Sequence, residues 1–174
     1  MLMVLWAAVA LMVIYLDQVT KWLSIALLKG EASFELIPDV LRFTYVENRG
    51  AAFGMLDEHR WVFLVLSTAT LIVLIGLMWK LRKNSPVMCL ALSLLVGGGI
   101  GNMIDRLALG YVVDFVDFCA FPNLWKWVFN LADSAVCVGA VLLLLCVLSG
   151  MIKEYWHERA EAMERSGKFR RNKD

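Results

Sequence analysis

Charged residues are scarce in this chain of 174 residues. Aspartate, glutamate, lysine and arginine together make up 19% of it, whereas 60% of the residues are hydrophobic. A soluble domain usually carries about 25% charged residues, because it has to cover its core with a polar surface. Together with a mean hydropathy of +0.68, the low charge excludes a soluble domain and indicates an integral membrane protein.

Cysteine and histidine are also few, and neither occurs in a ligand pattern. The four cysteines include no CxxC pair, and the two histidines, His59 and His157, are far apart in the chain. A disulfide framework or a zinc site would need closer groupings of these residues. We therefore expect no metal and no cofactor, and we expect the cysteines to be small core residues.

Long hydrophobic runs take the place of the missing charge. A membrane span needs about 17 to 25 such residues to cross about 30 Å of hydrocarbon, so the sequence predicts an all-α membrane protein with four transmembrane helices. The runs are Met1–Leu28, Trp61–Trp79, Pro86–Ile104 and Val128–Ile152. Because the first run lacks the basic start of a signal peptide, we expect it to be an uncleaved span.

Basic residues mark one side of the membrane. They occur in "KLRKNSP" (80–86), after the second run, and in the tail over residues 153–174. By the positive-inside rule both segments are cytoplasmic, and with four spans the N-terminus is cytoplasmic too. We expect a transmembrane domain over residues 1–152, with outer segments 29–60 and 105–127, followed by a basic cytoplasmic tail; the tail does not indicate a nucleic-acid partner.

The first outer segment contains an alternating stretch. In "DVLRFTYVEN", Leu41, Phe43 and Tyr45 share one face, which suggests a small β-hairpin or sheet on the outer leaflet, with an irregular loop as the alternative. Apolar residues further along, such as Phe53 and Met55, suggest a mobile cover over a site. Beyond Ile152, glutamate and arginine recur at helical spacing, which fits a solvated extension of the fourth helix.

Three polar residues share one face near the outer end of the third run. Asn102, Asp105 and Arg106 occupy positions i, i+3 and i+4 of the expected helix. Glycines just before them would let another helix approach closely. These glycines are Gly97, Gly98, Gly99 and Gly101.

Further polar residues lie at the same end of other runs. At the start of the fourth run, Asn130 and Asp133 are again spaced i and i+3. Asp114 lies in the apolar stretch "GYVVDF", which would hold it at the interface. In the first run, Asp17 and Lys21 form an i, i+4 pair at the outer end.

The stretch "ENRGAAFG" (47–54) adds Asn48 and Gly50 just before the second run. Every polar residue singled out therefore maps to the outer ends of the helices. An ionisable group inside a membrane segment costs about 2.5 to 3.5 kcal/mol on insertion scales. A cluster of such groups indicates a functional site near the outer interface.

Each group also has a structural alternative. The charges at the ends of the first and third runs could be ion pairs that fasten the helices, and the asparagines could be interhelical hydrogen-bonding residues. Asp114 and Asp133 fit this interpretation less well. The nearest cation left over, Lys126, could neutralise only one of them.

Two aspartates brought close together can hydrolyse a peptide bond. Because both cannot ionise comfortably, they share a proton, as in the aspartic proteases. The charged carboxylate deprotonates a water, while the protonated one donates to the scissile carbonyl and then assists the leaving amine. The pattern thus favours an aspartic peptidase.

Two other functions compete with this interpretation. A serine nucleophile would have to be Ser134 with His59 as its base, an arrangement the sequence supports weakly. A small proton-coupled transporter with four helices is the stronger alternative. A transporter usually places its acids near the bilayer midplane, whereas these acids cluster at one surface.

At these residues the chain resembles the lipoprotein signal peptidase family, the type II signal peptidases that act on bacterial prolipoproteins. The resemblance extends from about Asp17 to about Gly139. Five blocks carry it, in order and at family-like spacing: "DQVTK", "NRGAAFG", "GNMIDR", "GYVVDF" and "FNLADS". Any one block is a weak signal, but the ordered set is specific.

The resemblance implies that Asp114 and Asp133 are the catalytic dyad. It also implies site-lining and supporting residues, namely Asn48, Gly50, Asn102, Arg106, Asn130, Asp17, Lys21 and Asp105. The family fold is a four-helix membrane bundle with a small extracytoplasmic β-cradle and a lid helix.

The resemblance further implies the substrate and the location. The substrate is a prolipoprotein whose cysteine carries a diacylglyceryl group, and cleavage falls just before that cysteine. The enzyme would be a monomer in contact with lipid in the bacterial inner membrane, with an extracytoplasmic active site and sensitivity to the cyclic peptide globomycin.

Overall fold

The computed structural model describes residues 2–49, 60–82, 85–121 and 127–171. Within these ranges it contains four helices and four strands. The helices are α1 (Leu2–Leu28), α2 (Arg60–Leu81), α3 (Pro86–Ala108) and α4 (Leu131–Arg171). The strands are β1 (Phe34–Ile37), β2 (Leu41–Asn48), β3 (Val112–Phe118) and β4 (Val128–Phe129).

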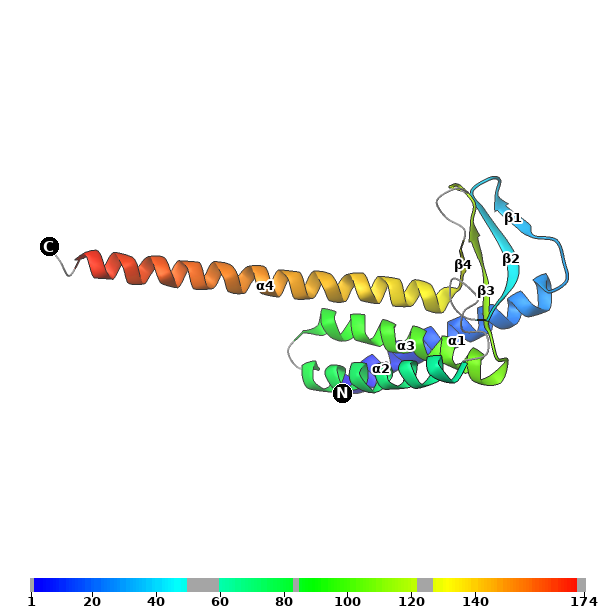
Figure 1. Cartoon of the computed structure of the whole chain (residues 1–174), viewed down its shortest axis with the longest axis horizontal. Coiled ribbons are helices and arrows are strands. Elements are labelled where there is room, and N and C mark those ends of the chain that lie inside the picture. Colours follow the sequence, from blue (N-terminus) through cyan, green and yellow to red (C-terminus); the bar gives the residue numbers. More distant parts are fainter. Residues whose placement is uncertain (1, 50–59, 83–84, 122–126, 172–174) are drawn as a thin grey trace.

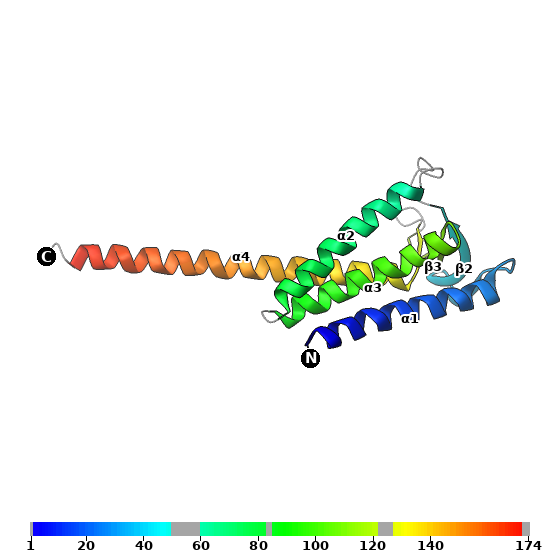
Figure 2. The ribbon, with the colours of Figure 1, turned by 90° about the horizontal axis from the view of Figure 1, so that it is seen from below.

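The four helices are long and apolar enough to cross a membrane, as the sequence predicts. Helix α3 is the centre of the bundle and packs against α1, α2 and α4 (Figures 1 and 2). It starts sharply because Ser85 caps it, accepting a hydrogen bond from the Met88 N–H at 3.3 Å, and because Pro86 occupies its first turn. It ends at Ala108, four residues beyond the predicted run.

Glycines on α3 allow the close helix contacts that the sequence predicts. A Cβ atom on Gly98 would overlap the backbone carbonyl of Ala132, at the start of α4. A Cβ atom on Gly101 would lie 2.5 Å from Oδ2 of Asp17 on α1. These two positions therefore require glycine, and they bring α1 and α4 to the same end of α3.

The strands form one antiparallel sheet in the order β1-β2-β3-β4, which lies across one end of the bundle (Figure 1). Strand β2 coincides with the alternating stretch, so the predicted hairpin is confirmed. The turn before it uses Asp39 at a φ of 57°, a conformation that aspartate tolerates well. Strand β3, which carries Asp114, joins the sheet through pairs such as Val46 with Asp114.

The fourth helix differs from the prediction at both ends. It begins at Leu131 rather than Val128, because Val128 and Phe129 pair with β3 instead. It continues past Ile152 as one unbroken helix to Arg171 and projects well beyond the other helices (Figure 1). The predicted helical extension is thus present, and the expected domain boundary after residue 152 falls within a continuous helix. The predicted cover at Phe53 and Met55 lies outside the described residues.

Candidate active site

A buried cation with two carboxylates lies beneath the site. The Lys21 ammonium on α1 lies 2.9 Å from Oδ2 of Asp17 and 2.9 Å from Oδ2 of Asp105 on α3. It also donates to Oδ1 of Asn102 at 2.9 Å, which uses all three of its N–H bonds. The side chains of the three charged residues are at most 4% exposed. The predicted Asp17–Lys21 pair is confirmed, and Asp105 joins it across the helix interface.

The two acids of this buried group also hold the backbone next to each candidate catalytic residue. Oδ1 of Asp17 accepts the N–H of Ala132 at 2.9 Å, and Oδ2 of Asp105 accepts the N–H of Val113 at 3.0 Å. Ala132 immediately precedes Asp133 in α4, and Val113 immediately precedes Asp114 in β3. One charged group in the bundle therefore positions both elements of the site.

Gln18 completes this support, and sequence reasoning missed it. Its side-chain amide donates to Oδ1 of Asp105 at 3.0 Å and to the carbonyl of Gly101 at 3.2 Å, so it joins α1 to α3. Its signals in the sequence were its place next to Asp17, in a polar interruption of an apolar run, and its inclusion in the block "DQVTK".

Asn130 caps helix α4 and connects it to the sheet. Its Oδ1 accepts the N–H of Asp133 at 2.9 Å, while Oδ2 of Asp133 accepts the N–H of Asn130 at 3.2 Å, a reciprocal capping box. The side-chain amide of Asn130 donates to Oδ1 of Asp114 at 2.7 Å and to Oδ1 of Asn102 at 3.1 Å. Asn130 is fully buried, so its position is fixed by these bonds.

Each candidate catalytic carboxylate accepts two N–H groups. Asp114 accepts from Asn48 on β2 at 2.8 Å and from Asn130. Asp133 accepts from the side chain of Asn102 at 2.7 Å and from the backbone of Asn130. The two aspartates, from different elements, are thus joined through one residue, Asn130, whose side-chain amide binds Asp114 and whose backbone N–H binds Asp133.

The environment of Asp114 favours its protonated form. Asp114 is 1% exposed, and burial raises the pKa of its carboxyl to about 6. The bond from Asn48 lowers this pKa, because it stabilises the charged form, and the nearby charge of Asp133 raises it. Asp114 therefore holds a proton under conditions in which an ordinary aspartate is ionised.

Arg106 lies at the same end of α3. Its guanidinium donates to the backbone carbonyl of Asn102 at 3.2 Å and lies within electrostatic range of Asp133 and Asp114. Of the site residues predicted from the sequence, all but Gly50 come together here, and Gly50 lies outside the described residues.

Comparison with known proteins identifies the family to which this arrangement belongs. Residues 9–149 match the family model described as signal peptidase (SPase) II. The chain belongs to the signal peptidase II family. Lipoprotein signal peptidase activity, that of an aspartic peptidase, follows from this membership.

Curated relatives and a solved structure agree with the signal peptidase II assignment. A lipoprotein signal peptidase of Caldanaerobacter subterraneus subsp. tengcongensis is 47% identical over 142 residues, which cover 81% of this chain and 94% of that protein. One of Halothermothrix orenii is 45% identical over 79% of this chain and 90% of its own length. A bacterial membrane enzyme solved by the in meso method, 35% identical, aligns with a TM-score of 0.71 over 83% of this chain and 87% of that one.

The family assignment decides between the two functions that the sequence left open. The chain is a multi-pass bacterial membrane enzyme of the signal peptidase II family, and the transporter interpretation is set aside. Its substrate is accordingly a prolipoprotein. The long part of α4 beyond residue 149 lies outside the family match.

Proposed function

We propose that Asp114 and Asp133 are the catalytic residues, and that the chain cleaves prolipoproteins just before the diacylglyceryl-modified cysteine. The observation that carries the proposal is the position of Asn130, which binds Oδ1 of Asp114 at 2.7 Å and forms a capping box with Asp133. A residue that holds both carboxylates keeps them at a fixed mutual position, which acid–base catalysis requires.

The two aspartates divide the proton transfers between them. Burial raises the pKa of Asp114 to about 6, so we assign the shared proton and the role of acid to Asp114, and the role of base to Asp133. Asp133 removes a proton from water as the water oxygen attacks the scissile carbonyl carbon. At the same time Asp114 gives its proton to the carbonyl oxygen, which produces a neutral tetrahedral intermediate.

Breakdown of the intermediate restores the starting state. Asp133 gives the proton that it took from water to the leaving amine of the cysteine, and the carbon–nitrogen bond breaks. Asp114 recovers a proton from the hydroxyl that becomes the new carbonyl of the signal peptide. Because a bound lipidated substrate excludes water, it favours the protonated form of Asp114 further.

The depth of the site suits a lipid-linked substrate. The carboxylates lie at the end of the bundle that carries the sheet, so an acyl chain in the bilayer would present the scissile bond at the interface. Arg106 is a cation beside the two aspartates. We propose that its guanidinium donates hydrogen bonds to the ester or carbonyl oxygens of the lipid-linked part of the substrate.

The topology proposed for the enzyme follows from its basic segments. The loop after α2 and the tail beyond Ile152 are cytoplasmic by the positive-inside rule, so both termini are cytoplasmic and the site is extracytoplasmic. We further propose that the enzyme is a monomer in the inner membrane and that globomycin inhibits it.

Cleavage of a purified diacylglyceryl-modified prolipoprotein tests the catalytic assignment. We expect Asp133→Asn to abolish cleavage while the protein stays folded. Asp117→Asn is the control, because Asp117 shares strand β3 with Asp114 but forms an ion pair with Arg42 at 2.7 Å, away from the site. Full activity of Asp133→Asn, or equal loss in Asp117→Asn, would contradict the assignment.

A further inference from the structure

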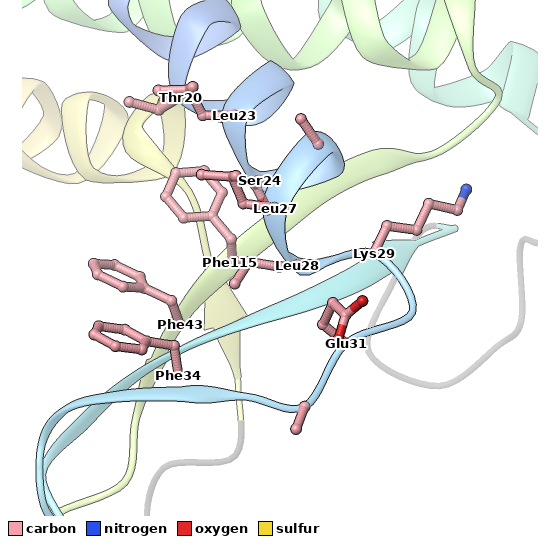
Figure 3. Close-up of a pocket in the computed structure, with 12 residues that line it drawn as sticks. Thr20, Leu23, Ser24, Leu27, Leu28, Lys29, Glu31, Phe34, Phe43 and Phe115 are labelled. Atoms are coloured by element: carbon pink, nitrogen blue, oxygen red, sulfur yellow. The ribbon is translucent and has the colours of Figure 1, made fainter.

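A second concave site lies on the opposite face of the sheet from Asp114. It is a groove of about 790 Å³ between the outer end of α1 and the sheet (Figure 3). Phe115 lines it, and because Phe115 follows Asp114 on β3, their side chains point to opposite faces of the sheet. The groove is therefore separate from the candidate active site.

Aromatic side chains from three neighbouring strands form one wall of the groove. Phe34 on β1 is the cross-strand partner of Phe43 on β2, and the rings of Phe43 and Phe115 lie 6.4 Å apart. Figure 3 shows these rings on the side of the sheet that faces α1, where Leu23 and Leu27 form the opposite wall. Both walls are thus apolar.

Much of this apolar surface is left uncovered by the protein. The exposed fractions are 67% for Leu27, 57% for Phe34 and 41% for Leu23. In a chain that spans the membrane, apolar surface that the protein leaves uncovered faces lipid. Within the described part of the chain, nothing packs over the groove.

The groove opens to the bilayer. It is lined by the last turns of α1, a helix of 27 residues and hence about 40 Å, which exceeds the hydrocarbon core of about 30 Å, so the groove lies where the helix passes from the hydrocarbon into the head-group region. Leu16, one turn earlier on α1, is 44% exposed, so the lipid-facing surface of the helix leads directly into the groove. Hydrocarbon chains reach this surface without leaving the membrane.

The polar groups of the groove are few and unequally placed. Lys29, just after the end of α1, has a side chain that is 50% exposed; it lies 3.2 Å from Glu47 and 5.2 Å from the ring centre of Tyr45. Deeper in, the Ser24 hydroxyl is buried and has no hydrogen-bond partner among the described residues. Glu31 also lines the groove, so its rim carries a cation together with carboxylates, and Lys29 is the group there that can bind a lipid phosphate.

We propose that this groove binds an acyl chain of a bilayer glycerophospholipid, with the lipid phosphate at Lys29. The lipid fills the space between α1 and the three phenylalanines and so supports the face of the sheet behind Asp114. The bilayer is the source of the lipid, because the groove and the candidate catalytic carboxylates lie on opposite faces of β3. The proposal stands on the groove alone and does not depend on which residues are catalytic.

Photo-crosslinking of the full-length enzyme in nanodiscs tests the proposal. The photoreactive amino acid p-benzoylphenylalanine replaces Phe34 in the groove or, as a matched control, Leu11, which is 64% exposed on the lipid-facing side of α1. The nanodiscs contain phosphatidylglycerol and phosphatidylcholine in equal amounts. Each variant is illuminated before and after extensive washing in lipid-free detergent, and the adducts are identified by mass spectrometry.

We expect the adduct at position 34 to be one glycerophospholipid that persists after washing, while the adduct at position 11 is lost. Lys29→Gln should reduce the retained adduct at position 34 several-fold. Equal loss at both positions would show an ordinary lipid-facing surface and overturn the proposal. So would an adduct that forms only when diacylglyceryl-modified prolipoprotein is added, because the groove would then belong to the substrate. The same measurements in Asp114→Asn keep this result independent of the catalytic assignment.

Discussion

The ammonium of Lys21 donates to Oδ1 of Asn102 at 2.9 Å. Because lysine has no acceptor, this bond requires the oxygen of the Asn102 amide to face Lys21. The amide nitrogen must then face the other way, where it donates to Oδ1 of Asp133 at 2.7 Å. Together with the Asn130 amide, which donates to the same oxygen at 3.1 Å, Lys21 therefore sets the orientation of the group that binds Asp133, although it touches neither candidate catalytic residue.

Replacing Lys21 by methionine separates this orienting role from a structural one. Lys21→Met leaves Asp17 and Asp105 buried without their cation, so we expect a loss of about 3 to 5 kcal/mol in the free energy of unfolding. Adding Asp105→Asn removes one of the two uncompensated charges and should restore part of that stability. It should not restore kcat fully, because Asn102 then keeps only one of the two donors that orient its amide oxygen, Asn130.

The measurements for this pair of variants are the thermal unfolding midpoint in detergent and the cleavage kinetics of a lipidated prolipoprotein. Recovery of stability and kcat together in the double variant would leave Lys21 with a structural role only.

The pKa of Asp114 predicts how activity depends on pH. If protonated Asp114 is the acid, kcat/KM should fall as the pH rises through about 6. Asn48→Ala removes a bond that stabilises the charged form, so the fall should move to higher pH. Measuring kcat/KM between pH 5 and pH 8 tests both statements. A flat wild-type profile, or a shift to lower pH in Asn48→Ala, would contradict them.

Stability should depend on pH through the same residue. The carboxyl pKa of Asp114 is raised from 3.8 to about 6 in the folded protein, so the folded state binds the proton more tightly than the unfolded state. The free energy of unfolding should therefore fall by at most about 3 kcal/mol as the pH rises from about 4 to about 6. Asp114→Asn should lose this part of the pH dependence, which denaturant unfolding at several pH values can measure.

Spans and local pairs could be predicted from the sequence because their signals are short-range. An apolar run of about 20 residues identifies a span wherever it packs, and an i, i+4 spacing brings Asp17 to Lys21 within one helix. The contact of Lys21 with Asp105, by contrast, joins residues on two helices. Lys21 reaches Asp105 only because α1 approaches α3 closely at Gly101.

Strand β3 shows another limit of the sequence. Val112, Val113, Asp114 and Phe115 are all buried, so the strand has no alternation of polar and apolar residues by which to recognise it. The asparagine network could not be predicted either, because an asparagine at a helix end serves equally well as an interhelical bond or a cap. Its partners depend on how β3 and α4 meet.

Gly98 should be essential for the placement of Asp133. Gly98→Ala would push the added methyl group into the backbone of Ala132, which precedes Asp133, so α4 must shift. We expect a loss of about 1 to 3 kcal/mol in stability and a fall in kcat. Gly76→Ala on α2 is the matched control, since no atom lies within 4 Å of its added Cβ. Equal behaviour of the two variants in unfolding and cleavage assays would argue against a tight α3–α4 contact.

The membrane topology can be tested by cysteine labelling. With both termini cytoplasmic, a cysteine at Glu35 on β1 should react with a membrane-impermeant maleimide in cells whose outer surface is accessible, whereas one at Ser166 should react only after lysis. The native cysteines are replaced first, because Cys119 is only partly buried on the sheet side. Labelling of position 166 from outside intact cells would show that the enzyme has the opposite orientation.

The strongest test of the catalytic pair is the double mutant. Asp114→Asn and Asp133→Asn keep the size of each side chain, and an asparagine oxygen can still accept a hydrogen bond, but each change removes the acid or the base. We expect each single variant to lose about 10²- to 10⁴-fold in kcat, and the double variant to be little worse, because residues that act as one unit are not additive. Unfolding midpoints should fall only modestly, because each asparagine loses one of the two hydrogen bonds that the aspartate accepts, while the removal of a like charge offsets part of that loss. A purely structural role predicts a large fall in the midpoint, with activity retained by the folded fraction. A folded Asp114→Asn variant that cleaves lipidated prolipoprotein at the wild-type rate would exclude Asp114 from the chemistry and require another acid within the site.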